Sequence, residues 1–209
     1  MTGLALAPRR HHPLLQKFGR AGLALVGWRI VGDIPPLPKF VAIVAPHTSN
    51  WDFPVGVLVM FALDLKVHWF GKDTLFRTPL GPFFRRLGGR PVNRAVPEGV
   101  VDEMVAIVRG EPRFILALAP EGTRKRVARW RTGFYRIAEQ ANIPVVPVSL
   151  DWSRRECTIG APMHPTGDIE RDVAALQAFY RPEMARNPGA FWGSTATDVP
   201  GTHVPGTRT

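Results

Sequence analysis

The stretch that decides the fold is "KFVAIVAPHTSNWDFPVGVLVMFALDL" (residues 39–65), in which a polar turn separates two apolar runs. The run at 39–45 is short and rich in β-branched residues, which predicts a buried strand. Residues 54–65 form a longer apolar run that predicts a helix, and Pro54 is tolerated in the first turn of a helix. A strand, a turn and a helix in this order are typical of a parallel α/β sheet.

The remaining sequence repeats this alternation. Short apolar runs predict strands at 66–71, 113–120, 143–150 and 156–162. Amphipathic runs predict helices at 12–31, 97–110, 133–142 and 167–184. We therefore expect an α/β fold with a mainly parallel sheet flanked by helices. The expected division is an N-terminal basic amphipathic helix in 1–37, a domain in 38–186 and a flexible C-terminal tail in 187–209.

Cysteine content and apolar run length limit the class of protein. The 209 residues include one cysteine, Cys157, so an internal disulfide is impossible and a reducing compartment is expected. Cys157 falls in a predicted strand, where we interpret it as a packing residue. No apolar run reaches the ~18 residues that a membrane span needs. The sequence thus predicts a cytoplasmic protein, free or bound to a surface, without a transmembrane span.

Basic residues are in excess and are unevenly placed. Lysine and arginine total 27 against 17 acidic residues, which suits a polyanionic partner. The predicted helix at 12–31 combines basic residues with an apolar stripe, and two interpretations stay open: packing on the domain, or contact with anionic lipid. Residues 124–136 carry six basic side chains and no acidic one. This cluster suits either an anionic surface or a solvated charged face.

His47 and Asp52 form a candidate pair in the turn after the first predicted strand. On one regular helix, residues five apart are rotated ~140° from each other. They can meet if His47 lies in the turn and Asp52 in the first helical turn, with Ser49 or Asn50 as the N-cap. The carboxylate would then fix the imidazole tautomer, and the other ring nitrogen could take a proton from a hydroxyl. The alternative is an ordinary helix cap with an incidental histidine.

Two further polar turns carry groups that suit phosphate. "PEGTR" (120–124) follows the predicted strand at 113–120 and combines a glycine for close approach, a threonine hydroxyl and an arginine. In parallel sheets, ligands bind beyond the carboxyl ends of the strands, where both His47 and Glu121 fall. The alternative is a surface turn in which Glu121 pairs with Arg124. "GGRPVNR" (88–94) adds Arg90 and Arg94 in a second turn that contains glycine.

Together these motifs resemble the glycerolipid acyltransferase family that includes 1-acylglycerol-3-phosphate acyltransferases. The resemblance covers roughly residues 38–162, so the expected domain at 38–186 is an acyltransferase domain. Four blocks match in the family's order: "HTSNWD", "GGRPVNR", "PEGTR" and "IPVVPVSL". The second block departs from the family, since "RPVN" stands where a bulkier apolar pair usually precedes the arginine. The hydrophobic N-terminal anchor of many relatives is reduced here to the helix at 12–31.

The resemblance implies a role for each matching residue. His47 would be the general base and Asp52 the carboxylate that orients it. The glycerol phosphate of the acceptor would be bound by Arg94, Glu121, Gly122, Thr123 and Arg124. Supporting positions are Lys72, the wall-forming Pro147, and Arg90, which we add because it lies nearby. No metal ligand is expected.

The resemblance also implies the reaction. The expected enzyme moves a fatty acyl group from acyl-CoA or acyl carrier protein to the free hydroxyl of a lysophospholipid. The first candidate acceptor is 1-acyl-sn-glycerol-3-phosphate, which would give phosphatidic acid. No covalent nucleophile stands out, so direct transfer without a cofactor is expected. The expected partners are the two substrates and an anionic membrane, which places the protein peripherally on the inner face of the cell membrane.

Three alternatives remain open. The first is an acyltransferase of the same family that acts on another lysolipid. The second is a nucleic-acid-binding module, suggested by the charge and by "RKRVARWR" (124–131), although no zinc-finger spacing or RNA-binding signature accompanies it. The third is a metal-dependent hydrolase with His47 and Asp52 as ligands, although the other histidines show no paired-ligand pattern. No nucleic-acid partner is expected.

Overall fold

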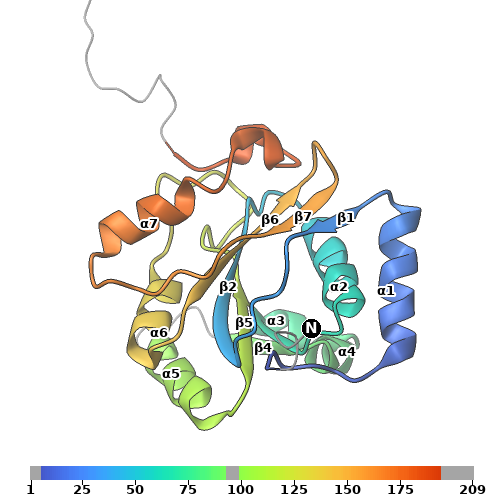
Figure 1. Ribbon diagram of the computed structural model, residues 1–209, viewed down its shortest axis with the longest axis horizontal. Helices are drawn as coiled ribbons and strands as arrows, with labels where there is room; N and C mark the ends of the chain where they lie inside the picture. Colours follow the sequence, from blue (N-terminus) through green and yellow to red (C-terminus); the bar gives the residue numbers. More distant parts are fainter. Residues whose placement is uncertain (1–5, 93–98, 194–209) are drawn as a thin grey trace, which may run out of the picture.

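The computed structural model describes residues 6–92 and 99–193, and its centre is a seven-stranded sheet with helices on both faces (Figure 1). The strand order is β1-β7-β6-β2-β5-β3-β4. All neighbouring pairs are parallel except β6 and β7. The strands are β1 (Arg29–Val31), β2 (Lys39–Ala45), β3 (Val67–Lys72), β4 (Gly89–Val92), β5 (Phe114–Leu118), β6 (Val145–Asp151) and β7 (Glu156–Ile159). The predicted fold class is therefore confirmed.

Helices cover the sheet in two layers. One side carries α1 and α2, whereas α5, α6 and α7 lie on the other side (Figure 1). The helices are α1 (Pro13–Leu25), α2 (Asp52–Ala62), α3 (Asp73–Phe76), α4 (Gly81–Arg86), α5 (Val100–Gly110), α6 (Gly133–Ala141) and α7 (Ile169–Gln177). Two 3-10 turns follow, η2 (Pro182–Met184) and η3 (Pro188–Ala190).

Strand β2 is the centre of the core. Its neighbours β5 and β6 both run parallel to it, so its backbone groups are paired on both edges. Val41 and Ile43 pack on the side of α5 and α6, and Phe40 and Ala42 pack on the side of α2. Burial on both faces explains why the sequence of β2 is a continuous apolar run rather than an alternating one. The strand fixes the position of the turn that follows it.

The helix expected at 12–31 is shorter than predicted, and only part of its apolar surface packs on the domain. It ends at Leu25, and Gly27 takes a φ of +72° as the chain turns back into β1. Gly19 faces α2 so closely that a Cβ there would lie 2.4 Å from the backbone nitrogen of Ala62. The outer face of α1 exposes Leu14 (70%), Phe18 (60%) and Leu25 (88%). The expected apolar stripe is thus divided between α2 and the surface.

Other boundaries also differ from the sequence prediction. The helix expected at 167–184 comprises α7 and the separate turn η2, and β1, α3, α4 and β4 were not foreseen. The described part of the expected flexible tail, residues 187–193, packs on the domain. Trp192 lies edge-on to Trp130, with ring centroids 4.7 Å apart, and Asn187 bonds to Thr48. This aromatic contact anchors a segment whose Gly- and Pro-rich sequence suggested mobility.

Candidate active site

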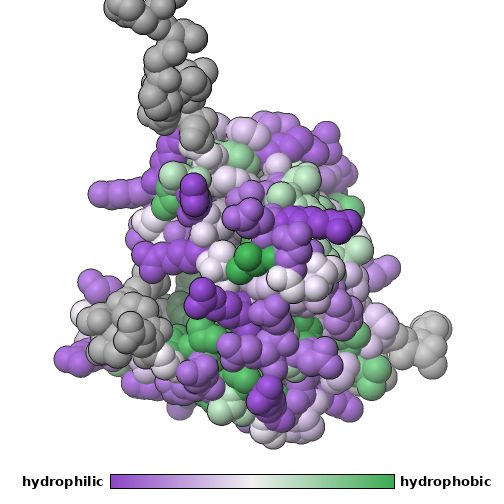
Figure 2. Space-filling model, turned by 90° about the vertical axis from the view of Figure 1, so that its left-hand side faces the viewer, coloured by the Kyte–Doolittle hydropathy of each residue, from purple (hydrophilic) through white to green (hydrophobic). Residues whose placement is uncertain are grey.

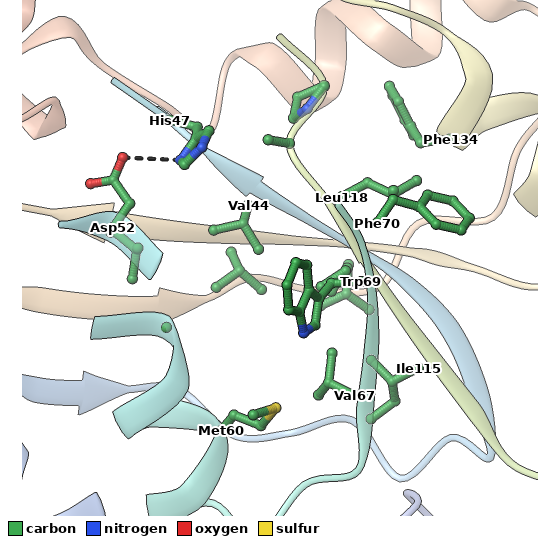
Figure 3. Close-up of a pocket in the computed structure, with 18 of the residues that line it drawn as sticks. Val44, His47, Asp52, Met60, Val67, Trp69, Phe70, Ile115, Leu118 and Phe134 are labelled. Carbon is green, nitrogen blue, oxygen red and sulfur yellow. Dashed lines mark ion pairs between the residues drawn. The ribbon is translucent and has the colours of Figure 1, made fainter. Parts of the chain in front are cut away.

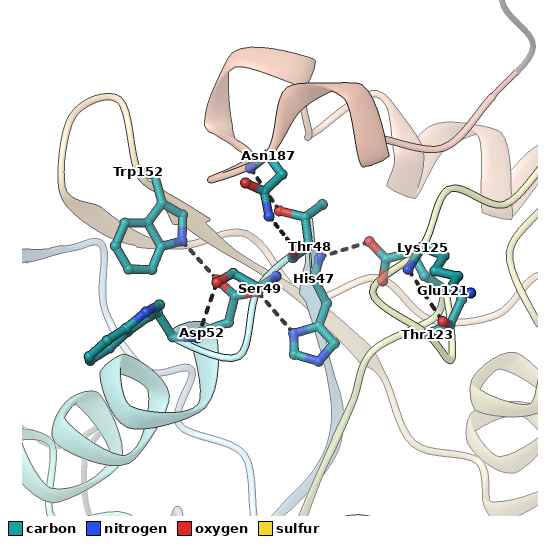
Figure 4. Close-up of polar contacts among 10 residues, drawn as sticks. His47, Thr48, Ser49, Asp52, Glu121, Thr123, Lys125, Trp152 and Asn187 are labelled. Atoms are coloured by element: carbon teal, nitrogen blue, oxygen red, sulfur yellow. Dashed lines mark hydrogen bonds and ion pairs between the residues drawn. The ribbon is translucent and has the colours of Figure 1, made fainter.

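His47 and Asp52 meet at the carboxyl end of β2, as the turn and helix geometry required. His47 lies in the turn after β2, and Asp52 is the first residue of α2. The Nδ1 atom of His47 lies 3.0 Å from Oδ2 of Asp52 (Figure 4). The Asp52 side chain is 2% exposed, whereas the His47 side chain retains 24% exposure. The imidazole therefore has one nitrogen on a buried carboxylate and a partly accessible ring.

Three donors surround the Asp52 carboxylate. Besides His47, the backbone N–H of Ser49 donates to Oδ2 at 2.9 Å, and the indole Nε1–H of Trp152 donates to Oδ1 at 2.8 Å. The expected N-cap at Ser49 or Asn50 is wrong, because Trp51 occupies that position without a side-chain cap. The turn is instead held by the side chain of Asp52, the first residue of α2, which accepts the backbone N–H of Ser49. Both carboxylate oxygens are thereby held in place.

Glu121 supports the same turn from the other side. Its Oε1 accepts the backbone N–H of His47 at 2.9 Å (Figure 4). The residue is 3% exposed, and burial raises the pKa of its carboxyl, although the hydrogen bond from His47 acts in the opposite direction. Its Oε2 is buried without a hydrogen-bond partner among the residues that the structure describes. Glu121 therefore lies beneath the His47 turn, unlike the surface pair with Arg124 that the alternative interpretation described.

A cavity of about 640 Å³ extends from the pair along the α2 side of the sheet, and its lining also includes Val101 of α5 and Phe134 of α6. Figure 3 shows His47 and Asp52 at one end and Met60, Val67 and Ile115 at the other. Most of its wall is apolar and comes from the central strands and α2, including Phe40, Ala42, Val44, Phe53, Val57, Ala117, Val146 and Val148. A pocket that is long, apolar and polar at one end suits a ligand with a hydrocarbon chain.

The turn after β5 contributes the polar wall. Gly122, Thr123 and Arg124 line the cavity, as expected for substrate-binding positions. Gly122 has a φ of +66°, which favours glycine, and a Cβ there would lie 2.9 Å from the side chain of Arg131. Arg131 also lines the cavity, and its backbone N–H donates to Pro120 at 2.8 Å. The sequence placed Arg131 within the basic cluster at 124–136, but no motif singled it out.

The other predicted positions are not brought to the cavity. Glu121, Lys72, Arg90 and Pro147 are absent from its lining among the described residues, so the substrate contact expected of Glu121 is not seen. Lys72 is exposed at the end of β3, and Pro147 is buried within β6. The guanidinium of Arg90 lies over the ring of Phe114, 5.9 Å from its centroid. Arg94 lies outside the described residues, so its predicted role stays a prediction.

No group of three or more His, Cys, Asp and Glu side chains suited to a metal ion occurs within 6–92 and 99–193. Cys157 is buried in β7, and this burial raises the pKa of its thiol to about 12. A thiol held protonated in this way is a packing group.

The fold and the site together define an α/β enzyme with a histidine–carboxylate pair beside an apolar cavity. The Acyltransferase family model matches residues 33–151, which is more than half of the chain, and the protein belongs to this family. It is therefore an acyltransferase, whose substrates include an acyl donor. No curated protein sequence matches the chain.

The fold is also found in a solved structure. It is the crystal structure of the 1-acyl-sn-glycerophosphate acyltransferase PlsC from Thermotoga maritima. The TM-score is 0.56 at 20% sequence identity, and the match covers 80% of this chain and 78% of that chain. At this identity the likeness establishes the arrangement of strands and helices.

The buried carboxyl of Glu121 gives a prediction for stability against pH. Because its pKa is raised in the folded state, the folded protein loses stability as the pH rises through that pKa. Glu121→Gln keeps an oxygen for the His47 N–H but removes the ionisation. We expect the variant to melt at a higher temperature than the wild type at pH 7–8. For a protein of this size, each kcal/mol gained in the free energy of unfolding raises the melting temperature by about 2–4 °C.

The difference should become small near pH 4, where the carboxyl is mostly protonated in both the folded and the unfolded state. Thermal unfolding followed by circular dichroism at pH 4 to 8 measures it. Exposed Glu139 on α6, changed to Gln, is the matched control. A Glu121→Gln variant that loses stability at every pH would contradict the raised pKa.

Proposed function

We propose that the protein transfers a fatty acyl group from a thioester to the free hydroxyl of a lysophospholipid, with 1-acyl-sn-glycerol-3-phosphate as the first candidate acceptor. The observation that carries the proposal is the His47–Asp52 pair at one end of a long apolar cavity. An acyl chain in the cavity would present its carbonyl carbon near the imidazole. The alternative is an acyltransferase of the same family that acts on another lysolipid.

His47 acts as the general base in the proposed mechanism. Its Nδ1 is engaged by Asp52, so Nε2 takes the proton from the acceptor hydroxyl while the hydroxyl oxygen attacks the thioester carbonyl. Asp52 stabilises the imidazolium that forms. The tetrahedral intermediate collapses, the carbon–sulfur bond breaks, and the thiolate takes the proton from His47. The acyl group thus passes directly from sulfur to oxygen without a covalent enzyme intermediate.

The polar end of the cavity is suited to the acceptor's phosphate. Arg124 and Arg131 both line it, and Thr123 adds a hydroxyl beside them. Guanidinium groups bind phosphate oxygens in pairs, which fixes orientation as well as charge. We assign Arg124 as the main phosphate ligand and keep Arg94 as a further candidate. The donor is acyl-CoA or acyl carrier protein as co-substrate, and no cofactor takes part.

The outer face of α1 suits contact with a membrane, where a lysophospholipid acceptor resides. It exposes Leu14, Phe18 and Leu25, with Lys17 and Arg20 also exposed on the same helix. The opposite side of the molecule, shown in Figure 2, is mainly hydrophilic. None of the helices in the described ranges has the length and apolarity of a bilayer span. We propose that α1 lies in the interface of an anionic membrane, at the inner face of the cell membrane.

Replacing the proposed base tests the mechanism. His47→Ala should lower the turnover number by at least about 10²–10⁴-fold, which is the usual contribution of general-base catalysis. The measurement is transfer of labelled acyl groups from acyl-CoA or acyl carrier protein to 1-acyl-sn-glycerol-3-phosphate. His164→Ala, at an exposed position outside the cavity, is the control. Turnover close to wild type in His47→Ala would remove His47 from the reaction.

Replacing the proposed phosphate ligand tests the acceptor. Arg124→Ala should raise the KM for 1-acyl-sn-glycerol-3-phosphate with little change in kcat, because a phosphate contact acts on bound and reacting states alike. The KM for an acceptor without phosphate, monoacylglycerol, should not change. Arg171→Ala on the exposed face of α7 is the control. An equal effect on both acceptors would show that Arg124 does not bind phosphate.

Changing the outer face of α1 tests the membrane contact. Leu14→Glu combined with Leu25→Glu should lower binding to vesicles of phosphatidylglycerol and phosphatidylethanolamine at least about tenfold, because apolar burial is lost and negative charge is added. Co-sedimentation measures the bound fraction. Ala174→Glu with Ala175→Glu, at exposed positions of α7, adds the same charge elsewhere. If both double variants bind equally, α1 is not the lipid contact.

A further inference from the structure

Three residues that follow the family-matched region hold the His47–Asp52 pair from outside the cavity. They are Trp152, in the turn after β6, and Arg186 and Asn187, between η2 and η3. We propose that Trp152, Arg186 and Asn187, here called the clamp, are positioning residues that keep the carboxylate and the imidazole in their reactive arrangement. The inference rests on the proposed function, because it assigns a role towards that same pair.

The contact of Trp152 with Asp52 is the first step. Its indole Nε1–H donates to Oδ1 at 2.8 Å, while Oδ2 faces His47 and Ser49 (Figure 4). Asp52 is 3% exposed, so water cannot readily replace a lost donor. Without the indole, Oδ1 would be buried and unbonded, and the carboxylate would gain freedom to rotate about its own bond. Trp152 thus fixes which oxygen faces the imidazole.

Arg186 holds the indole of Trp152 in turn. Its guanidinium carbon lies 4.4 Å from the centroid of the Trp152 ring and 5.4 Å from that of Trp51. Trp28 meets Trp152 edge-on, with ring centroids 5.0 Å apart. A cation over an aromatic face is attracted by the ring quadrupole. The indole is therefore in contact with both Arg186 and Trp28, and these contacts oppose a movement of its N–H away from Asp52.

Asn187 holds the residue beside His47. Its backbone N–H donates to Oγ1 of Thr48 at 3.2 Å, and its side-chain Nδ2 donates to the carbonyl oxygen of Thr48 at 2.8 Å (Figure 4). Thr48 is 4% exposed. The segment that carries Asn187 is itself tied down, since the Trp152 backbone N–H donates to the carbonyl of Met184 at 2.9 Å. Adjacent residues of one segment therefore contact the neighbours of the pair: Arg186 contacts the indole that donates to Asp52, and Asn187 bonds to Thr48, the residue after His47.

The clamp predicts a specific kinetic effect. None of its three residues lines the cavity among the described residues, so none is placed to bind substrate. Losing the clamp should therefore lower kcat, through a misplaced base, and leave the KM values almost unchanged. Trp152→Phe keeps an aromatic ring but removes the donor. We expect kcat to fall about 10–100-fold, the scale of a misplacement near 1 Å, with both KM values within about twofold of wild type.

A matched control separates the donor from the bulk of the ring. Trp130 is buried (6%), more deeply than the half-buried Trp152, and its Nε1 has no hydrogen-bond partner among the described residues, so Trp130→Phe loses ring volume without losing a bond. Its kcat should stay close to wild type. Arg186→Met and Asn187→Ala should each lower kcat, and Arg186→Lys should restore most of it, because lysine keeps the cation. These variants carry the test if Trp152→Phe does not fold.

A spectroscopic measurement tests the clamp without substrate. In ¹⁵N-histidine-labelled protein, neutral His47 should carry its proton on Nδ1, towards Asp52, and His47→Gln assigns its signals. Trp152→Phe should convert this state into a mixture of both tautomers, and Trp130→Phe should not. If the tautomer changes in Trp152→Phe but even the wild type transfers no acyl group, the proposed function fails and the clamp stands. If Trp152→Phe matches Trp130→Phe in both kcat and tautomer, or raises KM instead of lowering kcat, the clamp is overturned.

Discussion

The buried carboxylate of Asp52 is the group on which the rest of the site depends. A carboxylate taken out of water is costly unless its oxygens are fully bonded, and here Ser49, Trp152 and His47 supply the partners. The sheet order makes this possible. Strand β2 lies between β6 and β5, so the turn carrying His47 is flanked by the turns that carry Trp152 and Glu121. Parallel neighbours end at the same edge, and three distant segments thereby meet at one turn.

Two carboxylates bracket His47, and their environments differ. Asp52 contacts the imidazole, whereas Glu121 binds the backbone N–H and keeps one buried oxygen without a partner among the described residues. Burial raises the pKa of Glu121, and the nearby charges of His47 and Asp52 act on it in opposite directions. When His47 takes a proton, the positive charge of the imidazolium favours the ionised forms of Asp52 and Glu121. Positive charge created on the imidazole during proton transfer thus appears directly beside the Asp52 carboxylate.

The sequence predicted what depends on local pattern. Strand β2 was placed at its observed bounds because it is apolar on both faces, and the His47–Asp52 contact followed from the turn between strand and helix. The short β1, α3, α4 and β4 were missed because three to six residues carry too little periodicity. The clamp was also missed. Trp152 is 100 residues from Asp52, and Asn187 is 139 residues from Thr48, so no local spacing records either contact.

Helix α2 connects the proposed lipid-facing helix with the cavity. Its sequence is apolar around the whole circumference, which is typical of a helix buried on more than one side. One face, with Phe53, Val57 and Met60, lines the cavity, and Ala62 meets α1 across Gly19. An acyl chain in the cavity would therefore be separated from α1 by the single helix α2. The uninterrupted apolar sequence of α2 thus allows one helix to line the hydrocarbon pocket on one side and to pack against α1 on another.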